Sequence, residues 1–140
     1  MKLHSPIFIV GSGHSGTTLL SRMLNEHPNL FSIKIETYCF IKNDIKCLFK
    51  YQQTALKHNK KRIVEKTPKH FLCIKQIKKH FPNSTIIGMI RNGEYQVPSV
   101  MKRNKSKNIN EYLNLWVNGT TIVNKDCDLV IKMEDLINEP

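Results

Sequence analysis

The chain has 140 residues, of which 40% are hydrophobic, so it can build the core of a single domain over residues 1–140. The formal net charge of +11 at pH 7 favours a polyanionic ligand, but the lysines are spread along the chain without a nucleic-acid recognition motif, and we expect no nucleic-acid partner. No apolar run reaches membrane-spanning length and no signal peptide precedes the first predicted strand, which favours a cytoplasmic protein without a membrane span.

The first predicted element is a buried strand that runs into a glycine-rich turn. Residues 6–10 are apolar, residues 11–16 form a Gly-x-x-x-x-Gly pattern, and an apolar helix follows from Leu19. The unpaired N–H groups and the dipole at the start of a helix attract anions, and glycines let a phosphate approach the backbone closely. Hydroxyl groups add further donors at Ser15, Thr17 and Thr18. The stretch therefore predicts a phosphate-binding loop.

One position of this loop separates two classes of phosphate-binding protein. A nucleoside triphosphatase would carry Lys and then Ser or Thr after Gly16, but Thr17 stands at the lysine position. Residues 13–17 also fall one residue short of the nucleophile elbow of serine hydrolases, because Thr17 replaces the last glycine. A small nucleotide or nucleoside kinase, which would need Mg²⁺ and a loop lysine, is the alternative function at this point.

The middle of the chain predicts helices alternating with strands. Residues 36–58 contain no Gly or Pro and place apolar residues at helical spacing, which predicts one or two helices that cover a face of a sheet. A short strand is expected over 63–68, a helix over 69–80 and a second clearly buried strand over 85–90. Four apolar residues of the 69–80 helix are predicted to point inward: Phe71, Leu72, Ile74 and Ile77.

The last third of the chain continues the alternation. Helices are predicted from Val97 to Lys102 and over 109–123, followed by a strand over 129–133, and residues 134–136 begin an element that the chain does not complete. The resulting order, β–α–α–β–α–β–α–α–β, predicts an α/β fold with a parallel sheet and helices on both faces.

Three predicted strand ends carry residues suited to chemistry, and ligands bind beyond the carboxyl ends of such strands. Besides the loop at 11–18, Arg91 suits a forked contact to phosphate, and Ser99 lies two turns along the following helix. Glu65 and Lys66 offer a base and a cation, although neighbouring strand residues point to opposite faces unless the strand has already ended. Taken singly, each pair also fits a structural role, as a surface ion pair or a cap on the sheet.

Together these residues resemble the sulfotransferases that use 3′-phosphoadenosine 5′-phosphosulfate. In that family a strand followed by Gly-x-x-(Lys/Arg)-Ser-Gly-Thr-Thr holds the 5′-phosphosulfate, and residues 11–18 are similar to it. Arg91 and Ser99 match the arginine and serine that hold the 3′-phosphate. Residues 65–68 resemble the Glu-Lys-(Thr/Ser)-Pro element of bacterial and heparan-type members, and residues 130–136 resemble the strand and Glu-Asp-Leu signature before the family's last helices.

The resemblance implies a three-layer, P-loop-like fold of the sulfotransferase type and transfer of a sulfuryl group to a hydroxyl or amine of a small molecule, glycan or protein. It implies that Arg91 and Ser99 hold the 3′-phosphate, that Lys66 and His14 stabilise charge on the transferring group, and that Glu65 takes the acceptor proton. The donor is a co-substrate and no metal is expected. The implied contacts to its 5′-phosphosulfate come from Gly13, His14, Ser15, Gly16, Thr17 and Thr18.

Two departures from the family pattern bear on activity. His14 replaces the basic residue of the loop, and because the reference pKa of histidine is about 6.5, we expect it to act best when protonated and activity to fall as the pH rises. The sequence also stops soon after the Glu-Asp-Leu element, which predicts a domain without the family's C-terminal helices. A non-catalytic nucleotide-binding remnant is therefore a third interpretation.

Overall fold

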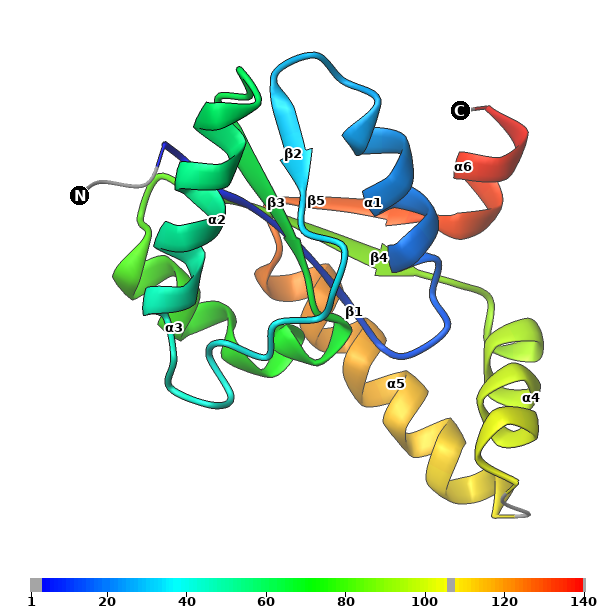
Figure 1. Cartoon of the computed structure of the whole chain (residues 1–140). Helices are drawn as coiled ribbons and strands as arrows, with labels where there is room; N and C mark the ends of the chain where they lie inside the picture. Colours follow the sequence, from blue (N-terminus) through cyan, green and yellow to red (C-terminus); the bar gives the residue numbers. More distant parts are fainter. Residues whose placement is uncertain (1–3, 106–107, 140) are drawn as a thin grey trace.

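The computed structural model describes residues 4–105 and 108–139, which form a five-stranded parallel sheet flanked by helices (Figure 1). The strand order across the sheet is β2-β3-β1-β4-β5, and each neighbouring pair is parallel. The strands are β1 (Ile7–Gly11), β2 (Leu30–Ser32), β3 (Arg62–Lys66), β4 (Thr85–Ile90) and β5 (Leu129–Lys132). The strand order places β1 at the centre, between β3 and β4, so the glycine-rich turn leaves the middle of the sheet.

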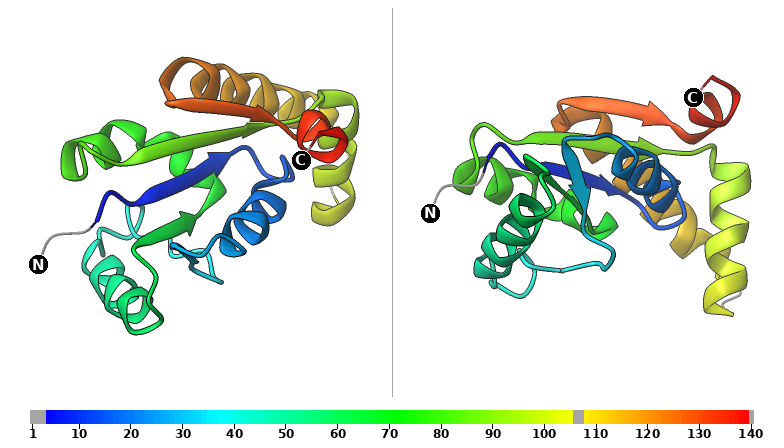
Figure 2. Two further views of the ribbon diagram at one scale, coloured as in Figure 1. Left: turned by 90° about the horizontal axis from the view of Figure 1, so that it is seen from above. Right: turned by 45° about the horizontal axis from the view of Figure 1, so that its top comes forward.

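Helices cover both faces of this sheet, as the α/β prediction requires. One core cluster joins the sheet to α1 and α6, and the other joins it to α2, α3 and α5. Figure 2 shows that α4 extends beyond the carboxyl ends of the central strands, where it packs against α5. The helices are α1 (Thr17–Asn25), α2 (Lys46–Lys57), the 3₁₀ helix η1 (Pro68–Cys73), α3 (Ile74–His80), α4 (Gly93–Asn104), α5 (Ile109–Asp126) and α6 (Met133–Asn138).

The central strand shows why this sequence forms a two-sided sheet. Phe8 and Val10 point to the α2–α3–α5 layer, whereas Ile7 and Ile9 point to the α1–α6 layer, and all four are buried. A parallel strand that is buried on both faces needs an unbroken apolar run, which is the pattern from which the strand was predicted. The predicted fold class is confirmed.

Two expectations within this fold are wrong in detail, and one strand was not expected. Residues 36–58 were expected to be helical, but only Lys46–Lys57 form a helix, because Tyr38 and Asn43 have φ values of 53° and 54°, which a right-handed helix does not allow. Leu72, expected to point inward, is 62% exposed, because η1 turns with a 3₁₀ rather than an α period. The three-residue strand β2 was not expected at all.

Candidate active site

The carboxyl ends of β1, β3 and β4 open into a cavity of about 1130 Å³. Its walls come from the glycine-rich turn, α1, the segment after β2, η1, α4 and α5. Six of the sequence-predicted site residues line it: Gly13, His14, Gly16, Thr17, Thr18 and Arg91. The topology therefore gathers, at one edge of the sheet, residues that lie far apart in the sequence.

The glycine-rich turn has the geometry of an anion-binding helix start. Gly16 caps α1 with a φ of 95°, which favours glycine, and neither a side-chain cap nor an acidic residue occupies the first turn of that helix. A Cβ at Gly11 would lie 2.6 Å from the carbonyl oxygen of Met89, so the neighbouring strand requires glycine there. Ser15 is fully buried beneath the turn, and within the described residues its hydroxyl has no hydrogen-bond partner. The amides at the start of α1 are thus free to face a ligand.

His14 links this turn to α4. Its Nδ1 lies 2.7 Å from Ser99 Oγ, its Nε2 lies 3.3 Å from Arg103 Nη1, and its carbonyl oxygen accepts a hydrogen bond from Arg91 Nη1 at 3.3 Å. A guanidinium can only donate, so Nε2 carries the lone pair and Nδ1–H donates to the hydroxyl of Ser99. Ser99 thus keeps its own proton for another acceptor.

The same surroundings keep the His14 ring neutral. Partial burial and the positive charges of Arg103 and Arg91 lower the pKa of His14 below its usual 6.5. His14 was expected to act best when protonated, and because two guanidinium groups oppose its protonation, that form is favoured only at a pH below the usual histidine range. The sequence did not reveal Arg103, since it lies at the far end of α4 without a motif around it.

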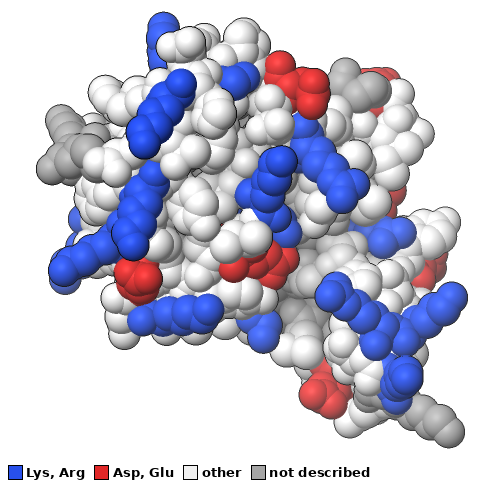
Figure 3. Space-filling view, viewed as in Figure 1, with Lys and Arg blue, Asp and Glu red and all other residues white. Residues whose placement is uncertain are grey.

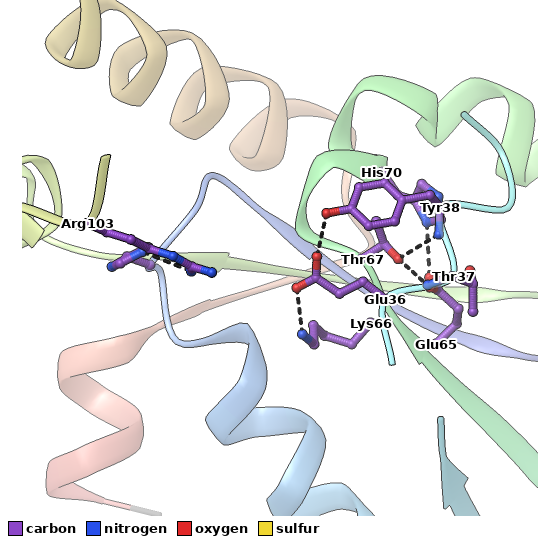
Figure 4. Close-up of polar contacts among 9 residues, drawn as sticks. Glu36, Thr37, Tyr38, Glu65, Lys66, Thr67, His70 and Arg103 are labelled. Carbon is purple, nitrogen blue, oxygen red and sulfur yellow. Dashed lines mark hydrogen bonds and ion pairs between the residues drawn. The ribbon is translucent and has the colours of Figure 1, made fainter. Parts of the chain in front are cut away.

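A second cluster lies across the cavity, on the segment that follows β2 (Figure 4). Lys66 Nζ lies 2.8 Å from Glu36 Oε1, and the Tyr38 hydroxyl donates to Glu36 Oε2 at 2.7 Å. Partial burial would raise the pKa of Glu36, but the hydrogen bonds from Lys66 and Tyr38 outweigh it, so the pKa of this carboxyl is lowered. Glu36 is therefore ionised at neutral pH; it lines the cavity, and its partner Lys66 lies behind it, outside the lining residues.

Glu65 lies elsewhere. Both Glu65 and Lys66 belong to β3, so their side chains point to opposite faces of the sheet, the arrangement that strand alternation allowed for. Lys66 points toward α1 and reaches Glu36, whereas Glu65 is 0% exposed and is hydrogen-bonded to Thr37, Thr67 and His70. Of the predicted residues, Glu65, Lys66 and Ser99 are not among those that line the cavity, whereas Glu36, which sequence reasoning missed, is.

Positively charged side chains outnumber carboxylates in the cavity walls. Figure 3 shows Lys and Arg on both sides of the hollow that separates α4 from the rest of this face. Against two carboxylates, Glu36 and Glu111, the described lining residues include four cations: Arg22, Lys69, Arg91 and Arg103. Such a balance suits a ligand that carries several negative charges.

Among the described residues, no group of three or more His, Cys, Asp or Glu side chains is placed to hold a metal ion. No helix in the described part of the chain is long and apolar enough to cross a membrane.

Comparison with known proteins assigns the class. A family model described as the sulfotransferase family matches residues 6–55 and 34–133. The chain therefore belongs to the sulfotransferase family, as its motifs indicated. Comparison with the curated proteins gave no significant match.

Solved structures agree with this assignment at the level of the fold. A sulfotransferase from Alicyclobacillus acidocaldarius superposes with a TM-score of 0.67 at 15% identity, covering 100% of this chain and 76% of its own. The sulfotransferase domain from the curacin biosynthetic pathway gives a TM-score of 0.73 at 19% identity, covering 100% and 71%. Shikimate kinase from Aquifex aeolicus gives 0.50 at 20% identity, covering 91% and 85%. The fold is thus the P-loop-like fold of sulfotransferases.

Proposed function

We propose that this protein transfers a sulfuryl group from 3′-phosphoadenosine 5′-phosphosulfate to a hydroxyl or amine of a small molecule, glycan or protein. The observation that carries the proposal is that one cavity is lined both by an uncapped glycine-rich helix start and by an ionised carboxylate, Glu36, which is paired with Lys66. Membership of the sulfotransferase family supports the transfer of a sulfuryl group. The donor and the acceptor class are the proposed part.

The donor nucleotide would be held at both of its phosphate ends. The free amides at the start of α1 would bind the 5′-phosphosulfate, together with the turn residues Gly13, His14, Ser15, Gly16, Thr17 and Thr18. Arg91 and Ser99 would hold the 3′-phosphate. Because His14 donates to the Ser99 oxygen, the Ser99 proton can be given to a phosphate oxygen.

The transfer itself would be an in-line displacement at sulfur. As the acceptor oxygen or nitrogen forms its bond to sulfur, the bond between sulfur and the bridging phosphate oxygen breaks, and adenosine 3′,5′-bisphosphate leaves with that electron pair. The acceptor proton would pass to Glu36, and we therefore give Glu36 the base role first assigned to Glu65. Lys66 and the free amides of the glycine-rich turn would stabilise charge on the transferring group, without a metal ion, because the Nδ1–H of His14 is already donated to Ser99.

The proposal is tested by a transfer assay. The protein is incubated with 3′-phosphoadenosine 5′-phosphosulfate and a panel of phenols, sugars and peptides, and release of adenosine 3′,5′-bisphosphate is measured together with the mass of the acceptor. Glu36→Gln should lower turnover by about 10²–10⁴ while nucleotide affinity is kept. Glu111→Gln is the matched control, because Glu111 lines the same cavity from α5. Equal turnover in both variants would contradict the base role of Glu36.

A further inference from the structure

The Glu65 carboxylate is a buried charge for which the proposed reaction has no direct use. A buried carboxylate is costly unless donors surround it, and among the described residues three supply those donors. Oε1 accepts from the hydroxyls of Thr37 at 2.8 Å and Thr67 at 2.6 Å and from the Thr37 amide at 3.4 Å. Oε2 lies 3.0 Å from His70 Nδ1. Both oxygens are therefore satisfied without water or solvent access.

The hydroxyls of Thr37 and Thr67 connect the Glu65 carboxylate to the backbone. A carboxylate can only accept, so each threonine hydroxyl donates to Glu65 and keeps its lone pairs for an amide. The Thr37 hydroxyl accepts from the amide of Cys39 at 3.2 Å, and the Thr67 hydroxyl accepts from the amide of Tyr38 at 3.3 Å. The amides of three consecutive residues, 37–39, are thus connected to one carboxylate, directly or through a single hydroxyl.

This segment needs such an anchor because its backbone is irregular. Residues 37–39 belong to no helix or strand, and Tyr38 has a φ of 53°, a conformation that is rare for a bulky residue. The segment also carries the groups that face the cavity: Glu36 immediately precedes it, and the Tyr38 hydroxyl donates to the Glu36 carboxylate. Its position sets where that carboxylate lies relative to Lys66.

His70 is the third residue that donates to the Glu65 carboxylate. Its ring is fully buried and packs edge-on against Phe40, with 5.4 Å between ring centroids. Its Nε2 has no hydrogen-bond partner among the described residues. Because a carboxylate can only accept, it is the Nδ1–H of His70 that donates to Glu65.

We propose that Glu65 is a positioning residue, whose buried carboxylate holds residues 37–39 so that the Glu36 carboxylate, which lines the cavity, stays paired with Lys66 and with the Tyr38 hydroxyl. The inference rests on the proposed function in that Glu36 is taken as the base, but the geometry it concerns is independent of any acceptor. If Glu65 is replaced, Glu36 should lose part of its contact with Lys66 and Tyr38. Arg103, the other cation that acts on Glu36, is carried by α4 and should stay in place.

The experiment measures the pKa of Glu36 by NMR with carbon-labelled glutamate, in the unsubstituted protein and in variants. In Glu65→Gln an amide replaces one accepting oxygen, and the pKa of Glu36 should rise back toward its usual value. Thr37→Val, which removes one connecting hydroxyl at nearly constant size, should move it in the same direction. Thr37→Ser, which keeps that hydroxyl, is the matched control and should leave it unchanged.

Activity and nucleotide affinity separate positioning from folding. With an acceptor in hand, Glu65→Gln should lower kcat by about tenfold to a hundredfold and move the acidic limb of the kcat profile to higher pH, while the Kd for adenosine 3′,5′-bisphosphate stays the same. An unchanged pKa of Glu36 in folded Glu65→Gln or Thr37→Val would overturn the inference. So would a Thr37→Val protein that fails to fold, because the network would then support the fold itself. Failure of Glu36→Gln to affect turnover would instead count against the proposed function, whatever the pKa values show.

Discussion

Replacing Arg91 by alanine tests the assignment of the 3′-phosphate site. Arg91 follows β4, lines the cavity and is half-buried, and its carbonyl oxygen accepts a hydrogen bond from Trp116 Nε1 at 3.0 Å. The backbone at this position is therefore held by α5 and should stay in place when the side chain is removed. In the described part of the chain, the guanidinium donates one long hydrogen bond, 3.3 Å to the carbonyl oxygen of His14. Its removal should cost little stability.

The expected effect on ligand binding is larger. A charge-assisted hydrogen bond contributes about 1.5–3 kcal/mol, which corresponds to about tenfold to a hundredfold in affinity. Adenosine 3′,5′-bisphosphate should therefore bind more tightly than 5′-AMP by about that factor, and Arg91→Ala should remove most of the difference while leaving the affinity for 5′-AMP nearly unchanged.

Titration calorimetry at fixed ionic strength measures both affinities. Arg22→Ala serves as the control for a general loss of positive charge, because Arg22 lines the same cavity from the last turn of α1. It should weaken both ligands alike. An undiminished preference for the bisphosphate in Arg91→Ala, or equal affinities in the unsubstituted protein, would refute the reasoning.

Three further predictions concern other parts of the molecule. In Gly88→Ala the new Cβ would overlap the side chains of Val123 and Cys127, so α5 or its side chains must move away from β4, and we expect chemical denaturation to show a loss of about 1–3 kcal/mol. An unchanged midpoint would contradict this prediction. Partial burial and the charges of Arg103 and Arg91 lower the pKa of His14, and the negative charge of a bound phosphate should raise it again. The affinity for adenosine 3′,5′-bisphosphate should therefore increase as the pH falls below about 6.5. Calorimetry in two buffers should show proton uptake on binding, and His14→Gln should lose it. Partial burial would raise the pKa of Asp128, but the hydrogen bonds from Lys78 and the Ile86 amide outweigh it and lower this pKa. Asp128→Asn should therefore cost about 1 kcal/mol of stability at neutral pH, the size expected for so exposed an ion pair, and the cost should vanish as the pH falls below about 3.8. A stability difference that does not depend on pH would contradict this prediction.

The sequence predicted the parts of the fold that depend on strong local patterns. The apolar run of β1 and the buried run of β4 each stand between clear turn signals, and both strands lie where they were expected. The edge strand β2 was not predicted, because three residues are too few to show a periodic pattern. The spacing of apolar residues after β2 predicts a helix from residue 36 onward. The residues around Tyr38 are not helical because they are held by tertiary contacts to Glu65 and Thr67, which the sequence does not reveal.

The sequence predicted the site residues that belong to a local motif, but not the pairs of side chains that only the tertiary structure brings together. The glycine-rich turn and Arg91 follow strands directly, so their places at the sheet edge follow from the topology. Glu36 lies in an irregular loop, and its pairing with Lys66 joins segments that are distant in the chain. The two faces of β3 decide the roles of Glu65 and Lys66, and the sequence left that choice open because it did not fix where the strand ends.

The central claim is that this cavity binds a sulfuryl-donor nucleotide and not a nucleoside triphosphate with its metal ion. It is tested most directly by calorimetry with adenosine 3′,5′-bisphosphate and with ATP, each in the presence and absence of Mg²⁺. We predict that the bisphosphate binds more tightly than ATP and that Mg²⁺ leaves its affinity unchanged, because Thr17 stands where a triphosphatase carries its loop lysine. Tighter binding of ATP that depends on Mg²⁺, with little or no binding of the bisphosphate, would contradict the account and favour a kinase.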